Sequence, residues 1–121
     1  MNKRSFVGYA ATLVSAALLT CAPGVQAQDY PSKPIKFVVA FPPGGSTDLV
    51  TRTIATQMAL ELKTPIVVDN KPGAGGNVAS QYVSNAAPDG YTIYLGTLAT
   101  HGINPVLHKN LPFDHLKDFT M

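Results

Sequence analysis

Three short apolar runs alternate with two stretches of helical periodicity, and this alternation constrains the fold more than any other feature of the sequence. The β-rich runs are residues 35–41, 66–68 and 91–95, and residues 47–63 and 77–87 separate them. The order strand, helix, strand, helix, strand, joined by short connections, predicts a mostly parallel sheet with right-handed crossovers and helices on its faces. The predicted fold class is therefore α/β.

The first helical stretch carries a regular apolar stripe. It contains no Gly or Pro, and its large apolar residues recur every four positions, so we expect this stripe to face the sheet. Ser46 or Thr47 is a candidate N-cap, and Asp48 suits the positive end of the helix dipole. The stripe consists of Val50, Ile54, Met58 and Leu62, with Ala55 and Ala59 beside it.

Each predicted strand ends in a loop of glycine, proline and small polar residues. These loops are residues 42–47, 70–77 and 96–104. In open parallel sheets, ligands bind beyond the carboxyl ends of the strands. The first two loops lead directly into helix N-termini, where free N–H groups and the helix dipole favour an anion. Three such loops at one edge favour an anion site over ordinary loop composition.

The loops do not match the known nucleotide-binding fingerprints. Neither glycine cluster has the Lys followed by Ser or Thr of a P-loop, and PPGGSTD stands where a dinucleotide fingerprint would open the first helix. A small carboxylate, which needs only a few N–H and hydroxyl donors, is the preferred anion, and we expect no cofactor. No G-x-S-x-G elbow surrounds Ser46, so a small hydrolase is the less favoured alternative and we expect no enzymatic activity.

The first 27 residues predict an export signal. Positive residues at 3 and 4 precede an uncharged apolar stretch from 6 to 19, which is too short for a spanning helix. Residues 25–27 suit cleavage after Ala27, which predicts a periplasmic protein. An alternative is a lipid anchor at Cys21, the only cysteine, because residues 18–21 resemble a lipoprotein attachment box.

Removal of this signal leaves a formally neutral chain. Lys3 and Arg4 account for the whole formal charge of +2, so seven basic residues face seven acidic ones. No basic cluster interleaved with aromatic residues is present, which argues against nucleic-acid binding. The single cysteine leaves with the signal, so neither a disulfide nor a thiol catalyst is expected.

Three histidines recur every seven residues and raise the question of a metal site. Pro105 and Pro112 break any common helical face between His101, His108 and His115. No Cys or clustered acid accompanies them. We interpret these histidines as incidental and expect no metal.

Several short motifs run in order along nearly all of the mature chain. They are PIKFVVAFPPGGSTD (34–48), VDNKPGAGGN (68–77), APDGY (87–91), Gly96-Thr97, His101, Asn104-Pro105, LPFD (111–114) and KDF (117–119). Together these motifs resemble the substrate-binding receptors of tripartite tricarboxylate transporters, the Bug-type periplasmic receptors. The resemblance implies one lobe of a two-lobed, type II periplasmic binding protein that catches a small carboxylate and delivers it to membrane permease subunits, as a monomer at full length.

The resemblance also implies which residues form the site. The first and second loops would grip one carboxylate through backbone donors and ordered water, and the third loop would line another side. We expect Asp48 to bond local N–H groups and shape its loop, with direct ligand contact as the alternative. The implied set is Phe41, Pro43, Gly44, Gly45, Ser46 and Asp48 in the first loop, Gly73, Gly75, Gly76 and Asn77 in the second, and Thr97, His101 and Asn104 in the third.

In the resembling receptors, the chain leaves the first lobe after the position of Asn104-Pro105. We therefore expect residues 28–104 to be a partial first lobe, and residues 105–121 to start the crossover to a second lobe that this chain lacks. A sheet edge and apolar helix faces should be exposed. The chain alone should bind a carboxylate weakly or not at all, because closure between lobes supplies the far side. Sensing for a membrane sensor kinase and a non-functional fragment stay open as alternatives.

Overall fold

A three-stranded parallel sheet forms the centre of the molecule. The structure is a computed structural model that describes residues 30–120, so the predicted signal and Cys21 lie outside the described residues. The strands β1 (Ile35–Val39), β2 (Ile66–Asn70) and β3 (Thr92–Tyr94) lie in the order β2-β1-β3. Both pairings of β1 are parallel. The predicted α/β class is confirmed, and the carboxyl ends of all three strands lie at one edge.

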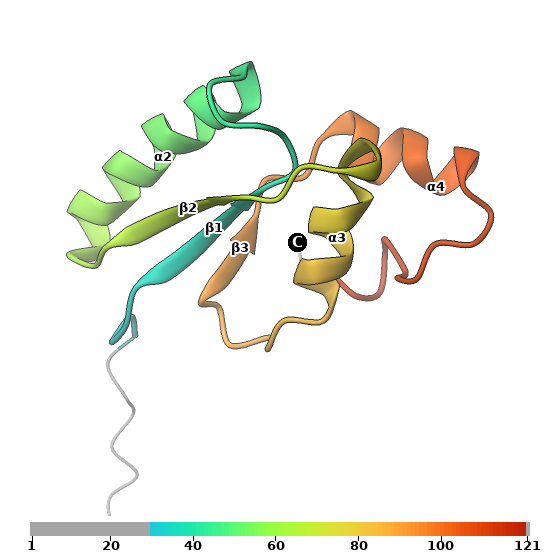
Figure 1. Ribbon diagram of the computed structural model, residues 1–121. Coiled ribbons are helices and arrows are strands. Elements are labelled where there is room, and N and C mark those ends of the chain that lie inside the picture. The colour runs from blue at the N-terminus through green and yellow to red at the C-terminus, as the bar shows by residue number, and fades with distance from the viewer. Residues whose placement is uncertain (1–29, 121) are drawn as a thin grey trace, which may run out of the picture.

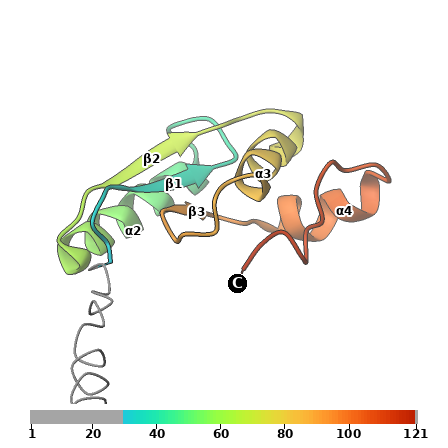
Figure 2. The same ribbon diagram turned by 90° about the horizontal axis from the view of Figure 1, so that it is seen from below.

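Two helices connect the strands and cover opposite faces of the sheet (Figures 1 and 2). Helix α2 (Ser46–Leu62) joins β1 to β2 and contacts both strands, whereas α3 (Asn77–Ser84) joins β2 to β3 and contacts β1 and β3. A short 3-10 turn, η1 (Ala74–Gly76), precedes α3. None of the helices within residues 30–120 is long and apolar enough to cross a membrane.

The central strand β1 is covered on both faces, as its continuous apolar sequence predicts. On the α3 face, Val38 and Ala40 pack with Ala79 of α3, and the half-buried Tyr94 lies against them. Successive side chains of a strand alternate between its faces, so Ile35, Phe37 and Val39 point toward α2. All three are buried.

The predicted contact face of α2 is right at Ala55 but wrong for the stripe of large apolar residues beside it. Its buried residues are Asp48, Thr51 and Ala55, whereas Val50 of the apolar stripe is 52% exposed. Small side chains let the helix approach the sheet closely, and this turns the stripe of larger residues toward solvent. The exposed stripe agrees with the expectation of uncovered apolar helix faces. The expected cap is also wrong: Gly45 is the N-cap, without a side-chain bond, and Ser46 is already helical.

Residues 98–107, for which the sequence predicts the third loop up to residue 104 and then the start of the crossover, are helical. A π-helical segment, η2 (Leu98–Ile103), leads into the short helix α4 (Asn104–Leu107). The side chain of Thr97 caps η2 in a reciprocal box with Thr100. This arrangement fixes how the third loop meets the second.

Candidate functional site

The three predicted loops meet at the carboxyl edge of the sheet. The loop after β1 leads into α2, the loop after β2 leads through η1 into α3, and the loop after β3 leads into η2 (Figure 1). The second and third loops contact each other directly, through η1 and η2. The first loop places Phe41 half-buried, and Pro43, Gly44, Gly45 and Ser46 exposed.

Asp48 organises the first loop from inside the protein. Its side chain is 2% exposed. Oδ2 accepts hydrogen bonds from the Gly44 N–H and from Arg52 Nε, both at 2.9 Å, and Oδ1 accepts one from Asn70 Nδ2 at 2.9 Å. The bond from Arg52, followed by those from Gly44 and Asn70, holds the pKa of the Asp48 carboxyl far below its usual range. The carboxylate therefore shapes the loop, as expected.

Asn70 and Arg52 tie this loop to the end of β2. Asn70 Nδ2 also donates to the carbonyl of Phe41 at 3.0 Å, and Asn70 Oδ1 accepts from Arg52 Nη2 at 3.1 Å. Sequence reasoning missed both residues. The spacing of Arg52 four residues after Asp48 on a helix is a signal that could have found the ion pair. No comparable local signal exists for Asn70, because its partners come from other elements.

The first turn of α2 presents free backbone donors. Its first helical hydrogen bond runs from the Leu49 N–H to the Gly45 carbonyl. Among the described residues, the N–H groups of Gly45, Ser46 and Thr47 have no acceptor. The positive end of a 17-residue helix dipole adds to these donors. This turn can therefore hold an anion.

The second loop uses part of its donors internally. Gly73, Gly75 and Gly76 have positive φ angles of 138°, 64° and 98°. The Gly76 N–H donates to the Gly73 carbonyl, and the Asn77 N–H donates to the Ala74 carbonyl. The predicted residues Gly76 and Asn77 therefore have no backbone donor to spare. The Gly75 N–H has no acceptor among the described residues.

Asn104 and Thr100 lock the third loop onto the second. Asn104, 6% exposed, donates from Nδ2 to the Gly75 carbonyl at 2.9 Å and to Asn77 Oδ1 at 2.8 Å. A Cβ on Gly76 would lie 2.5 Å from Thr100 Cγ2. The two loops thus form one packed unit, in which Asn104 is committed to protein partners.

His101 and Thr97 lie beside a groove of about 850 Å³ between β3, the end of α3 and residues 115–120. The His101 ring packs against Tyr94 and Phe119, with centroids 5.6 and 5.0 Å away, and its Nδ1 lies 2.9 Å from Thr100 Oγ1. Burial, and to a lesser extent His115, lowers the pKa of His101. None of the residues that line this groove within the described chain comes from the first or second loop.

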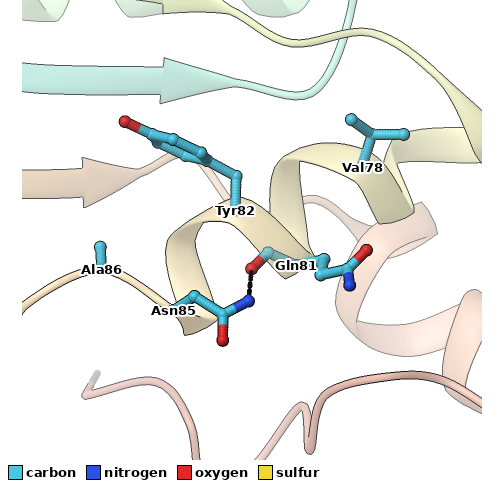
Figure 3. A pocket seen from close by; sticks show the side chains of 5 residues that line it. All are labelled: Val78, Gln81, Tyr82, Asn85 and Ala86. Carbon is cyan, nitrogen blue, oxygen red and sulfur yellow. Dashed lines mark hydrogen bonds between the residues drawn. The ribbon is translucent and has the colours of Figure 1, made fainter.

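A second hollow, of about 490 Å³, lies on the outer side of α3 (Figure 3). Its lining residues are all on or just after α3, and include Val78 and Tyr82 but none of the predicted site residues. Within residues 30–120, no group of three His, Cys, Asp or Glu side chains could hold a metal ion. The loop edge therefore stands out as the candidate site, because it gathers free N–H donors.

Comparison with known proteins places the sequence in a family. Residues 50–121 match the tripartite tricarboxylate transporter family receptor. A UPF0065 protein of Bordetella pertussis is 46% identical over 101 residues, which cover 84% of this chain and 31% of that protein. Protein BugT of the same organism is 39% identical over 95 residues, or 78% of this chain and 29% of BugT. The chain spans about one third of the length of these relatives.

Solved structures with the same fold include ligand complexes. MatC from Rhodopseudomonas palustris with bound malate superposes with a TM-score of 0.72 at 44% identity, over 75% of this chain and 31% of MatC. A second R. palustris protein, solved with adipate, gives a TM-score of 0.69 at 34% identity, over 72% of this chain and 29% of that one. The matched family and structures are receptors and binding proteins, not enzymes. The chain described here belongs to the tripartite tricarboxylate transporter receptor family.

Proposed function

We propose that this chain forms part of the first lobe of a periplasmic receptor, and that its loop edge binds one carboxylate group of a small organic acid. The observation that carries this proposal is the row of free N–H groups at Gly45, Ser46 and Thr47, which opens α2 at the loop edge, where the Gly75 N–H of the second loop is also free. The malate and adipate complexes of the two similar structures support the ligand class.

The charges around the edge fit a site made of neutral donors. Arg52 is paired with Asp48 at 2.9 Å, so neither residue offers a free charge to the ligand. A carboxylate accepts hydrogen bonds through two oxygens, and bonds between an ionised acceptor and backbone N–H groups are stronger than neutral ones. The loop edge can therefore bind a carboxylate through backbone N–H groups, without a salt bridge to the ligand.

Membership of the family supports an extension of this proposal to the rest of the receptor. In the proposal, residues 28–104 belong to the first lobe, residues 105–121 begin the crossover, and a second lobe supplies the far side of the ligand. The loaded receptor would deliver its ligand to membrane permease subunits. Because one wall of the site supplies only part of the contacts, we expect the chain alone to bind malate with a dissociation constant on the order of 1 mM.

Calorimetric titration of the purified chain with malate and adipate tests the ligand class, and the corresponding neutral diamides serve as matched controls. We expect both acids to bind and neither diamide to do so, because the diamides lack the ionised acceptor. Equal binding of acids and diamides would refute the carboxylate site. Micromolar binding of malate would refute the requirement for a second lobe.

A further inference from the structure

The side-chain amides of Asn104 and Asn77 form a directed pair. Asn104 Nδ2 donates one proton to the Gly75 carbonyl at 2.9 Å and the other to Asn77 Oδ1 at 2.8 Å. Asn104 is buried, whereas Asn77, at the start of α3, is half-exposed. The pair therefore joins the interior of the loop unit to its surface.

The Gly75 carbonyl, as the buried partner, determines how both side-chain amides are oriented. A backbone carbonyl can only accept, so the Gly75 carbonyl requires the NH₂ side of the Asn104 amide. The second proton of that NH₂ group requires an acceptor, so Asn77 must present Oδ1 to it. The Asn77 Nδ2 group is then directed away from Asn104, and among the described residues it has no acceptor.

We propose that Asn104 is a positioning residue for ligand binding, which acts by turning the Asn77 side chain so that its NH₂ group donates to the bound carboxylate. This inference rests on the proposed function and assigns Asn104 a role other than ligand contact. It also explains how Asn77 contributes to the site although its backbone N–H is occupied by the Ala74 carbonyl.

The substitution Asn104→Asp reverses the direction of the hydrogen bond between residues 104 and 77 without changing the size of the side chain. A carboxylate cannot donate to the Gly75 carbonyl, and it attracts the NH₂ group of Asn77, which turns Asn77 Oδ1 toward the ligand. We expect malate affinity, measured by NMR titration of the full chain, to fall about tenfold, because one charge-assisted hydrogen bond is lost.

A double-mutant cycle separates positioning from a purely structural role. In the Asn77→Ala background the donor is already absent, so Asn104→Asp should cost clearly less malate affinity than in the unsubstituted chain, and the loss that remains measures repulsion between the new carboxylate and the ligand. A second loss of about tenfold in that background, or unchanged affinity in Asn104→Asp alone, would overturn the proposal.

A measurement on the unsubstituted chain decides the question even if the variant fails to fold. We expect slow hydrogen exchange for the Asn104 NH₂ protons, fast exchange for those of Asn77, and a malate-induced shift of the Asn77 side-chain signal. Shifts of the Gly45–Thr47 amides without a shift of the Asn77 side chain would refute only the role of Asn104 in positioning Asn77. The absence of any malate-induced shift would refute the proposed function as well.

Discussion

Among single residues, Asp48 shows how an acidic side chain can lie inside the loop of the proposed anion site with its charge already balanced by protein groups. Its carboxylate accepts hydrogen bonds from Gly44, Arg52 and Asn70, so its charge is balanced inside the loop. These bonds lower its pKa in the folded chain. A lowered pKa means that the stabilisation is complete above the pKa of the unfolded chain, about 4, and is lost as the pH falls toward the folded value.

We therefore expect Asp48→Asn to lower the urea midpoint of unfolding at pH 7, because an amide cannot accept all three hydrogen bonds. The difference from the unsubstituted chain should shrink as the pH is lowered below about 4, where Asp48 of the unfolded chain begins to protonate while that of the folded chain stays ionised. Urea titrations of both chains at pH 7 and at a pH below about 4 measure the two differences in midpoint. Glu61→Gln, at an exposed position on the same helix, is the control and should have no effect. A midpoint for Asp48→Asn equal to that of the control would contradict this role.

Alanine substitutions at Gly76 and Gly44 test the contact between the second and third loops, with Gly44 as the matched control. Both have positive φ angles, but an added Cβ meets Thr100 only at Gly76, and nothing lies within 4 Å of it at Gly44. We expect Gly44→Ala to cost about 1 kcal/mol of unfolding free energy from backbone strain alone. Gly76→Ala should cost about 2 kcal/mol more from overpacking. Equal costs in chemical denaturation would show that the two loops do not pack closely.

Among the elements, the start of α2 carries the central binding argument. Ser46 is the first helical residue and follows Gly45 at φ −74° and ψ 168°, which is a backbone compatible with a following proline. Ser46→Pro therefore removes one N–H donor without disturbing the helix. We expect it to weaken malate binding about tenfold, because a hydrogen bond to a charged group is lost. Ser46→Ala, which removes only the hydroxyl, is the control, and an equal effect of both substitutions would exclude the backbone donor.

Elements that depend on local pattern were predictable from the sequence, and those that depend on neighbours were not. The apolar run of β1 indicated a doubly covered strand, and the loops after the strands indicated the edge where they meet. The face of α2 was not predictable, because periodicity shows which residues could be buried but not that Thr51 and Ala55 permit a closer approach. The contacts of Asn70 and Asn104 join distant segments, so no local pattern reveals them.

For the molecule as a whole, the α3 face of the sheet is only partly covered. Helix α3 lies over β1 and β3, so Val38 is fully buried, whereas Val67 of β2 on the same face is 53% exposed. Large apolar residues of α2 and α4 also face solvent, among them Leu60 and Val106. These surfaces agree with a chain that spans about one third of the length of its relatives.

This partial coverage can be tested with one substitution at two positions. Val38→Thr should lower the unfolding free energy by about 2 kcal/mol, because it buries a hydroxyl group. Val67→Thr keeps the β-branched shape at an exposed position, and we expect a change within about 0.5 kcal/mol. Urea unfolding measures both values. A loss at Val67 as large as that at Val38 would show that β2 is covered on this face.

The most direct test of the central claim is a malate titration of the ¹⁵N-labelled chain, followed by NMR at each backbone amide. The account predicts that the Gly45, Ser46, Thr47 and Gly75 amides shift together along one binding curve, because one carboxylate accepts from both loops. It also predicts smaller shifts at Gly76, whose N–H is bonded within its own loop. Shifts confined to one loop, or centred on the groove around His101, would contradict it.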